Sequence, residues 1–239
     1  MPSEPHLSVR LQHRIGALTL DAAVTTSSPW TVLFGPSGSG KSTILRAIAG
    51  LFRPQNGSIT VGDQLVCDIS QRICLAPRFR PVCWSAQHPA LFPHLSAAQN
   101  IAFGLARTQG LSAAQVRSAT EEALAHFQLE AFALRRPAHL SGGEQQRVAI
   151  ARAAIGARGK LLLLDEPFTG LHTELRDRLL TDLRAWLGPT PVVSVTHNVA
   201  EAILLKAEVI RIAQGKVVAQ GAASSVLADE RTQLLAALR

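Results

Sequence analysis

A glycine-rich segment at residues 35–42, here called the phosphate loop, is the part of the sequence best suited to chemistry. It reads GPSGSGKS and matches the pattern G-x-x-x-x-G-K-[ST], in which backbone N–H groups surround a phosphate chain. Lys41 can reach the β- and γ-phosphates of a nucleotide, and the Ser42 hydroxyl can ligate Mg²⁺. The residues expected to bind phosphate are Gly35, Pro36, Ser37, Gly38, Ser39, Gly40, Lys41, Ser42 and Thr43. An apolar segment precedes the loop and a helical pattern follows it, so the sequence predicts nucleotide binding rather than an incidental glycine-rich turn.

Two acidic residues follow a second apolar segment. Asp165 and Glu166 come directly after residues 161–164, four leucines that are typical of a strand buried inside a parallel sheet. Ligands of such sheets bind at the carboxyl ends of the strands. We therefore expect Asp165 to hold Mg²⁺ and Glu166 to orient or deprotonate the water that attacks the γ-phosphate. The alternative is a solvated strand end without a catalytic role.

A third apolar segment, residues 192–195, ends in Thr196 and His197. If this segment is another strand of the same sheet, His197 lies at the same edge as the phosphate loop. It could then donate a hydrogen bond to the γ-phosphate and respond to its loss. The alternative is a histidine with a structural role at a strand end.

The signature segment, residues 140–147, reads LSGGEQQR and precedes a strong helical pattern. Ser141 and Glu144 have the spacing of a capping box, which a helix start alone would explain. Capping does not explain the two glycines, Gly142 and Gly143. A serine and two glycines before a helix also make a binding site for an anion. Both interpretations are open at this point.

The remaining pattern predicts alternating strands and helices. Strands are expected at residues 7–11, 15–24, 30–34, 58–61, 65–68, 161–164 and 192–195, with a hairpin at 209–221 that turns at 214–215. A helix is expected at residues 43–51 with Leu51 on its buried face. Helical periodicity covers residues 96–132, where Ser112 can cap a helix whose apolar stripe reaches Phe127.

Composition excludes several classes of protein. The chain has 239 residues, of which 47% are hydrophobic and 17% charged, so it can bury a sizeable core and is not globally disordered. No apolar run approaches the roughly 18 residues of a membrane span, and the N-terminus does not resemble a signal peptide. We expect a cytoplasmic chain whose three cysteines, Cys67, Cys74 and Cys83, are reduced structural thiols. The net charge of +7 suits a polyanionic partner, whether nucleic acid, a membrane surface or a nucleotide.

With the signature segment, the phosphate loop, the acidic pair and His197 in this order, the sequence resembles the ATPases of ATP-binding-cassette (ABC) transporters over essentially its whole length. The resemblance implies an α/β fold of the P-loop NTPase type. That fold has a RecA-like parallel sheet core, an N-terminal antiparallel β region and a helical signature insertion. It also implies a single nucleotide-binding domain at residues 1–239, with a helical subdomain at about 88–158.

The resemblance further implies how the site works. In this family two cassettes dimerise head-to-tail, so Ser141, Gly142 and Gly143 would contact ATP held by the partner's phosphate loop. Gln87 would ligate Mg²⁺ or water and would couple the site to a membrane partner. The implied catalytic residues are Glu166, His197, Gln87 and Lys41. The implied metal ligands are Ser42, Gln87 and Asp165, and the implied cofactors are ATP and Mg²⁺.

The resemblance also points to transport. Residues 73–77 and 91–95 look most like molybdate-importer cassettes, and residues 90–104 resemble the segment that docks a permease. We expect an importer ATPase that forms a homodimer and binds integral-membrane permease subunits at the cytoplasmic face of the plasma (inner) membrane. It would serve a periplasmic or extracellular solute-binding protein indirectly and would not bind nucleic acid. The alternatives are an importer ATPase for sulfate, iron or polyamine, a soluble ABC ATPase acting on nucleic acid or ribosomes, and a cassette without turnover.

The sequence departs from the family pattern at two places. His172 stands where the family usually has an aspartate that helps to link the two sites of the dimer. The chain has no tyrosine, and His13 and Arg14 occupy roughly the position of the aromatic residue on which the adenine usually stacks. We expect one of these two side chains to stack instead, and adenine recognition to be weaker.

Overall fold

The structure, a computed structural model, describes residues 6–105 and 110–237, apart from the side chains of residues 233–237. The chain divides into two compact units. The first is formed by Met1–Val82 and Pro191–Arg239, and the second by Cys83–Thr190. The second unit extends beyond the helical subdomain expected at residues 88–158, because it also contains a strand and a helix on the C-terminal side of that segment.

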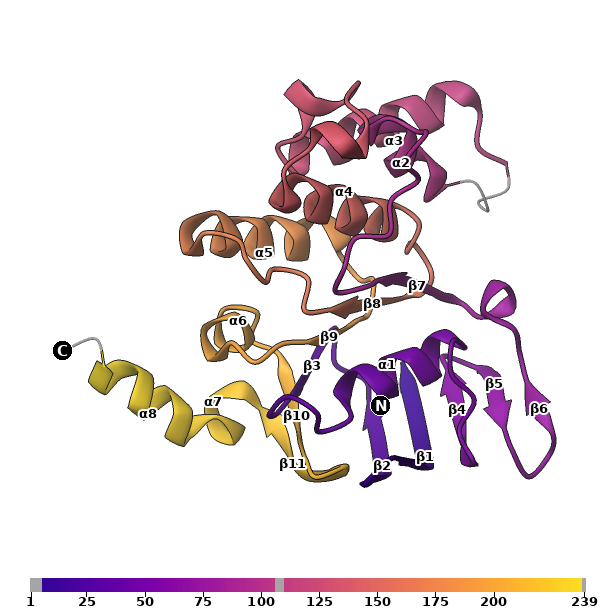
Figure 1. Cartoon of the computed structure of the whole chain (residues 1–239), viewed down its shortest axis with the longest axis vertical. Helices are drawn as coiled ribbons and strands as arrows, with labels where there is room; N and C mark the ends of the chain where they lie inside the picture. The colour runs from indigo at the N-terminus through magenta and orange to yellow at the C-terminus, as the bar shows by residue number, and fades with distance from the viewer. Residues whose placement is uncertain (1–5, 106–109, 238–239) are drawn as a thin grey trace. The chain divides into compact units, whose positions relative to one another are not determined.

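The first unit is built on a sheet in which segments from both ends of the sequence lie side by side (Figure 1). The strand order is β6-β5-β4-β1-β2-β11-β10-β3-β9. The strands are β1 (Leu7–Ile15), β2 (Leu18–Thr26), β3 (Trp30–Phe34), β4 (Asn56–Val61), β5 (Gln64–Asp68), β6 (Ile73–Cys74), β9 (Val192–Val195), β10 (Glu208–Ala213) and β11 (Lys216–Ala222). The strands from β6 to β2 pair antiparallel, whereas β10, β3 and β9 are parallel. The predicted antiparallel region beside a parallel core is confirmed.

Burial explains why the two parts of this sheet have different sequences. In β1 the apolar residues Leu7, Val9 and Leu11 are each 1% exposed and alternate with more exposed residues, which is typical of a sheet with one solvated face. In β3 all five residues are buried, as expected for a parallel strand covered on both sides. The strand predicted at residues 15–24 begins only at Leu18, because Gly16 has a φ of +59° and turns the chain.

Helix α1 (Lys41–Ala49) follows the phosphate loop directly. This helix begins and ends two residues earlier than the predicted range of 43–51. Gly40 and Gly50, which both adopt the left-handed conformation, mark its two ends. Leu51 therefore lies beyond the helix and is 53% exposed, so its predicted place on the buried face was wrong. The buried side chain of Arg80 donates to the carbonyl oxygens of Ala47 at 2.7 Å and Ile48 at 3.0 Å, which satisfies the C-terminal end of the helix.

The second unit contains strand β8 (Leu161–Asp165) beside β7 (Val82–Ser85), whose first residue belongs to the first unit. Its helices are α2 (Ala97–Phe103), α3 (Ala113–His126), α4 (Gly142–Ile155) and α5 (Thr173–Leu187). Helices α2, α3 and α4 pack together (Figure 1). The helical pattern predicted over residues 96–132 is therefore two separate helices. Phe127, the predicted end of the apolar stripe, is buried.

The remaining helices belong to the first unit and are short or lie near its C-terminus. They are α6 (Val199–Leu204), α7 (Ala223–Val226) and α8 (Ala228–Ala237). Single 3-10 turns lie at Pro77–Phe79, Glu130–Phe132 and Pro137–His139. Over residues 6–105 and 110–237, no helix combines the length and the apolar content that a bilayer crossing would require.

Three helices of the second unit begin with complete capping boxes, in which a serine side chain and a glutamine or glutamate side chain satisfy each other's backbone N–H groups. The serines are Ser96 for α2, Ser112 for α3 and Ser141 for α4, which confirms the predicted caps at Ser112 and Ser141. Helix α5 is different. Its N-cap is His172, whose side chain accepts no capping hydrogen bond.

We predict that His172→Asp stabilises the chain, because an aspartate at an N-cap accepts a hydrogen bond from the first turn and favours the positive end of the helix. The gain in the free energy of unfolding should be about 1 kcal/mol, which corresponds to a rise in Tm of roughly 2–4 °C. Thermal denaturation followed by circular dichroism measures it. His172→Ala is the control and should give no such gain. An equal Tm for the aspartate and alanine variants would contradict the cap.

Candidate functional site

The phosphate loop joins β3 to α1 through backbone conformations that only glycine adopts readily. Gly35 has a φ of +151°, and a Cβ atom on it would collide with the carbonyl oxygen of Ile212 on β10. Gly40 has a φ of +104°, and a Cβ atom there would lie 2.9 Å from Leu20 Cδ1. These two glycines are therefore required by the path of the chain, which must turn tightly beside the parallel strands.

Lys41 lies inside this loop, with only 6% of its surface exposed. Its ammonium group donates to the carbonyl oxygens of Gly35 at 2.8 Å and Pro36 at 2.7 Å. Ser42 and Thr43 follow it in the first turn of α1. The ammonium charge and the positive end of the helix are thus next to each other, and this arrangement favours an anion such as a phosphate chain.

His197 lies at the same edge of the first unit's sheet as the phosphate loop. Strands β3 and β9 are parallel, with Leu33 opposite Val195, so both end at this edge. The Trp30 indole N–H donates to the Ser194 hydroxyl at 2.9 Å and joins the two strands through side chains as well. The His197 side chain is exposed. The structure therefore brings together the two site elements that the sequence predicted for this unit.

The acidic pair lies at the end of β8 in the second unit. Asp165 is its last residue and is 2% exposed. Glu166 has a φ of +46°, a conformation uncommon for a residue with a side chain. Its Oε2 atom accepts from Gln87 Nε2 at 3.4 Å and from the Thr169 hydroxyl at 3.2 Å. The structure thus brings together Gln87 and Glu166, which are 79 residues apart in the sequence.

The signature segment begins α4 with an exposed backbone. The Ser141 hydroxyl accepts from Glu144 N–H at 3.3 Å, and Ser141 N–H donates to the Glu144 carboxylate at 2.7 Å. A Cβ atom added to Gly142 would meet nothing within 4 Å, and one added to Gly143 would meet Leu171 Cδ2 at 3.2 Å. Packing in the described residues therefore does not require a glycine at position 142. The N–H groups of Gly142 and Gly143 have no acceptor within the helix, as at every helix start, and can face an anion.

Two further polar residues, which the sequence patterns did not indicate as functional, fix the segment that follows Gln87. Arg152, on α4, donates to the carbonyl oxygen of Ala90 at 2.6 Å, and its guanidinium lies 5.3 Å from the ring centre of Phe92. Asn100 is fully buried and bonds both the N–H and the carbonyl of Phe92. Burial lowers the pKa of Arg152. An arginine within the apolar run VAIARAAI is the sequence signal for such a half-buried contact.

The two candidates for adenine stacking differ in their surroundings. The His13 ring packs edge-on against Phe52, with 4.4 Å between ring centres. Arg14 is exposed, and its Nε atom donates to the carbonyl oxygen of Gly16 at 3.3 Å. Both line an open polar pocket of about 330 Å³ that Asn56 and Asp21 also border. Because the ring of His13 already contacts Phe52, Arg14 is the more accessible of the two.

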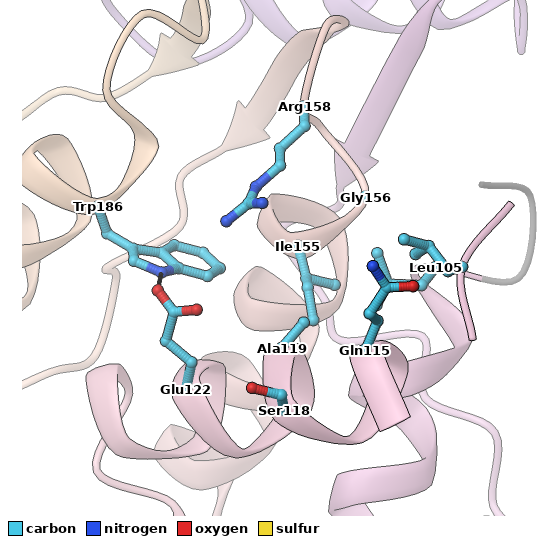
Figure 2. Close-up of a pocket in the computed structure, with 10 residues that line it drawn as sticks. Leu105, Gln115, Ser118, Ala119, Glu122, Ile155, Gly156, Arg158 and Trp186 are labelled. Atoms are coloured by element: carbon cyan, nitrogen blue, oxygen red, sulfur yellow. Dashed lines mark hydrogen bonds between the residues drawn. The ribbon is translucent and has the colours of Figure 1, made fainter. Parts of the chain in front are cut away.

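A second pocket, of about 310 Å³, lies in the second unit (Figure 2). Trp186 and Glu122 border it, and the indole N–H of Trp186 donates to the Glu122 carboxylate at 2.7 Å. Arg158 and Ile155 form other parts of its lining. None of the predicted site residues lines this pocket, so it has no place in the predicted phosphate chemistry.

Comparison with known proteins gives consistent results. The ABC transporter family matches residues 25–169. A molybdenum import ATP-binding protein, ModC, from Mesorhizobium japonicum is 39% identical over 97% of this chain and 62% of its own length. A spermidine/putrescine import ATP-binding protein, PotA, from Pseudomonas fluorescens is 40% identical over 85% of this chain and 54% of its own length. The chain thus spans little more than half the length of these relatives.

The fold is similar to that of a solved cassette. The ATP-binding cassette MJ0796, solved as a dimer in a post-hydrolysis state with ADP and Pi, superposes with a TM-score of 0.76. It is 26% identical and covers 91% of this chain and 98% of its own. The P-loop NTPase fold is therefore confirmed. The residues matched by the family include the phosphate loop, the signature segment and the acidic pair, and the chain belongs to the ABC transporter family.

Proposed function

We propose that this chain hydrolyses ATP as the nucleotide-binding subunit of an ABC importer. The observation that carries the proposal is the phosphate loop closed around Lys41, whose ammonium group lies 2.7 Å and 2.8 Å from two carbonyl oxygens of the loop. A phosphate chain that enters the loop would replace these neutral acceptors with charged ones, which form stronger hydrogen bonds with an ammonium. Lys41 would then neutralise charge on the β- and γ-phosphates.

The donor atoms proposed for the metal suit Mg²⁺. Ser42, Gln87 and Asp165 offer a hydroxyl, an amide and a carboxylate oxygen, and Mg²⁺ in nucleotide sites takes few protein ligands besides phosphate and water. Over residues 6–105 and 110–237, no group of three or more His, Cys, Asp or Glu side chains could hold a metal on its own. A bound Mg²⁺ would neutralise charge that develops on the phosphates.

Glu166 is the proposed general base. Its carboxylate would accept a proton from the attacking water as the oxygen of that water bonds to the γ-phosphorus and the bond to the β-phosphate oxygen breaks. Gln87 and Thr169 already contact Oε2 of this carboxylate and would hold it in one orientation. His197 would donate a hydrogen bond to the γ-phosphate. Positioning by these groups supplies much of the catalysis in this class of reaction.

We predict that Glu166→Gln lowers ATP hydrolysis by about 10²-fold or more, because an amide cannot accept the proton. ATP should still bind, so the variant should accumulate as an ATP-bound dimer. Phosphate release measures hydrolysis, and size-exclusion chromatography with ATP measures the dimer. Glu174→Gln, an exposed acid in the first turn of α5, is the matched control and should behave as the unmodified chain. Undiminished hydrolysis in Glu166→Gln would defeat the assigned mechanism.

The signature segment is proposed to complete the site of a second cassette. Its bare N–H groups at Gly142 and Gly143 and the hydroxyl of Ser141 would contact the γ-phosphate held by the partner's phosphate loop. Packing in the described residues gives no reason for a glycine at position 142, and this contact would supply one. The cassettes would close on ATP and open after hydrolysis.

We predict that Gly142→Ala leaves the chain at least as stable, because the added methyl meets nothing within 4 Å and alanine is the better helix former. The methyl would hold the partner's nucleotide away from the backbone. ATP-dependent dimerisation and hydrolysis should each fall by about 10-fold or more. Thermal denaturation, size-exclusion chromatography and phosphate release measure the three effects. Ala113→Gly changes the equivalent first position of α3 and is the matched control. Full activity in Gly142→Ala would contradict the contact.

The transported solute is proposed to be molybdate or a related oxyanion. The 39% identity to a relative named for molybdenum import over 97% of the chain supports this choice. The similar identity to a relative named for spermidine/putrescine import keeps polyamine as the second candidate, with sulfate and iron as others. The chain would act as a homodimer on the cytoplasmic face of the membrane. Its partners would be permease subunits that take solute from a binding protein.

Uptake by cells that lack the gene tests this assignment. We predict loss of radiolabelled molybdate uptake with spermidine and iron uptake unchanged, because those solutes are cations and a site built for an oxyanion would not serve them. The unmodified chain should restore uptake, whereas Glu166→Gln should not. Loss of spermidine uptake instead would assign a polyamine importer. Copurification with nucleic acid in a nuclease-sensitive form, without a membrane protein, would overturn the transport function.

A further inference from the structure

Two cysteines face each other across the antiparallel pair of β5 and β6. Cys67 lies opposite Cys74, and their Sγ atoms are 3.8 Å apart. The Leu75 N–H donates to the carbonyl oxygen of Val66 at 2.9 Å, so residues 66 and 75 form a hydrogen-bonded pair of the ladder. Pairs alternate along an antiparallel ladder, so Cys67 and Cys74 form a non-hydrogen-bonded pair.

This register is the one that suits a disulfide. In non-hydrogen-bonded pairs the Cα atoms lie about 4.5 Å apart and the side chains approach most closely. Disulfides span Cα distances of about 4.4–6.8 Å. The two sulfur atoms could therefore bond after small side-chain rotations, without any change in the pairing of the strands.

The two thiols differ in their surroundings. Cys74 is exposed, whereas Cys67 is fully buried and donates its S–H to the sulfur of Cys74. Burial, followed by the neighbouring Cys74, raises the pKa of Cys67 to about 11. A reagent in solution would therefore meet Cys74 first, and Cys67 would react only with a group already attached to Cys74.

Arg80 holds the two strands in this position. It is 4% exposed, and its Nε atom donates to the carbonyl oxygen of Leu75 at 2.9 Å. Its Nη1 atom donates to Ala47 at the end of α1, and its Nη2 atom lies 3.6 Å from Cys74 Sγ. Strand β6 has only two residues, but this buried cation anchors it, so the thiols stay opposed. Such preorganisation raises the rate of a reaction between two groups of one chain.

We propose that Cys67 and Cys74 are a modification site, a dithiol that is oxidised reversibly to an intrachain disulfide by a low-molecular-weight disulfide such as oxidised glutathione. The Cys74 thiolate attacks one sulfur of glutathione disulfide, forming a mixed disulfide and releasing one glutathione thiolate. Cys67 then loses its proton to solvent and attacks the Cys74 sulfur, releasing the second glutathione thiolate. The chain loses two electrons and two protons, and the oxidant becomes two molecules of reduced glutathione.

The test treats the folded, full-length chain with oxidised glutathione. Two of the three thiols should disappear from a thiol titration, and the intact mass should fall by two hydrogen atoms, with no glutathione attached. Dithiothreitol should restore both values. Cys83, which lies in the second unit with its Sγ donating to the carbonyl oxygen of Gly156, should remain reduced, and Cys83→Ser should react as the unmodified chain does.

Two variants identify the roles of the thiols. Cys67→Ser should retain glutathione on Cys74, because no thiol of the chain then faces Cys74 to displace it, and Cys74→Ser should react at least 10-fold more slowly at Cys67. The displacement of glutathione in the unmodified chain should accelerate about tenfold per pH unit between pH 7 and pH 10, because the thiolate of Cys67 increases with pH below its pKa. Retention of glutathione on Cys74 in the unmodified chain, three unreacted thiols, or a displacement rate independent of pH would overturn the proposal.

Discussion

The rest of the phosphate loop depends on the burial of one positive charge. An ammonium group that is removed from water must be hydrogen-bonded, and Lys41 obtains these bonds from the carbonyl oxygens of Gly35 and Pro36. The carbonyls can turn inward only if the chain bends sharply as it leaves β3, where Gly35 lies against Ile212 of β10. Several features of the loop therefore serve to offset the desolvation of Lys41. They are the order of the parallel strands, the position of the glycines and the start of α1.

In the second unit, polar side chains hold irregular segments and helix starts in place. Asn100 and Arg152 bind the backbone after Gln87 to α2 and α4, and complete capping boxes start α2, α3 and α4. Arg152 lies in α4, and Ser141 is the N-cap of the same helix. A rigid movement of α4 would therefore shift both the signature segment and the segment after Gln87. This connection is made by hydrogen bonds of Arg152 and by those of the buried Asn100 side chain.

Local patterns predicted the parts of the structure that are determined locally. Residues 30–34 and 192–195 form strands as expected from their unbroken apolar runs, and Gln214 and Gly215 form the predicted turn, both with positive φ. Errors occur where a left-handed glycine ends an element earlier than the apolar pattern does, as with Gly50 before Leu51. The pairing of β6 with β5 could not be predicted, because a two-residue strand has no periodicity. The contacts of Arg152 with Ala90 and Asn100 join segments that are distant in sequence, so only the fold reveals them.

The backbone at Glu166 places stability and chemistry in opposition. A left-handed conformation costs a residue with a Cβ atom roughly 1–2 kcal/mol, and a glycine at this position would avoid that cost. Folding alone would therefore select against the carboxylate that Gln87 and Thr169 contact. The chain nevertheless has at this strand end a residue that lowers the stability of the fold. Such a trade-off is expected where a side chain is present for its reactivity and not for its contribution to stability.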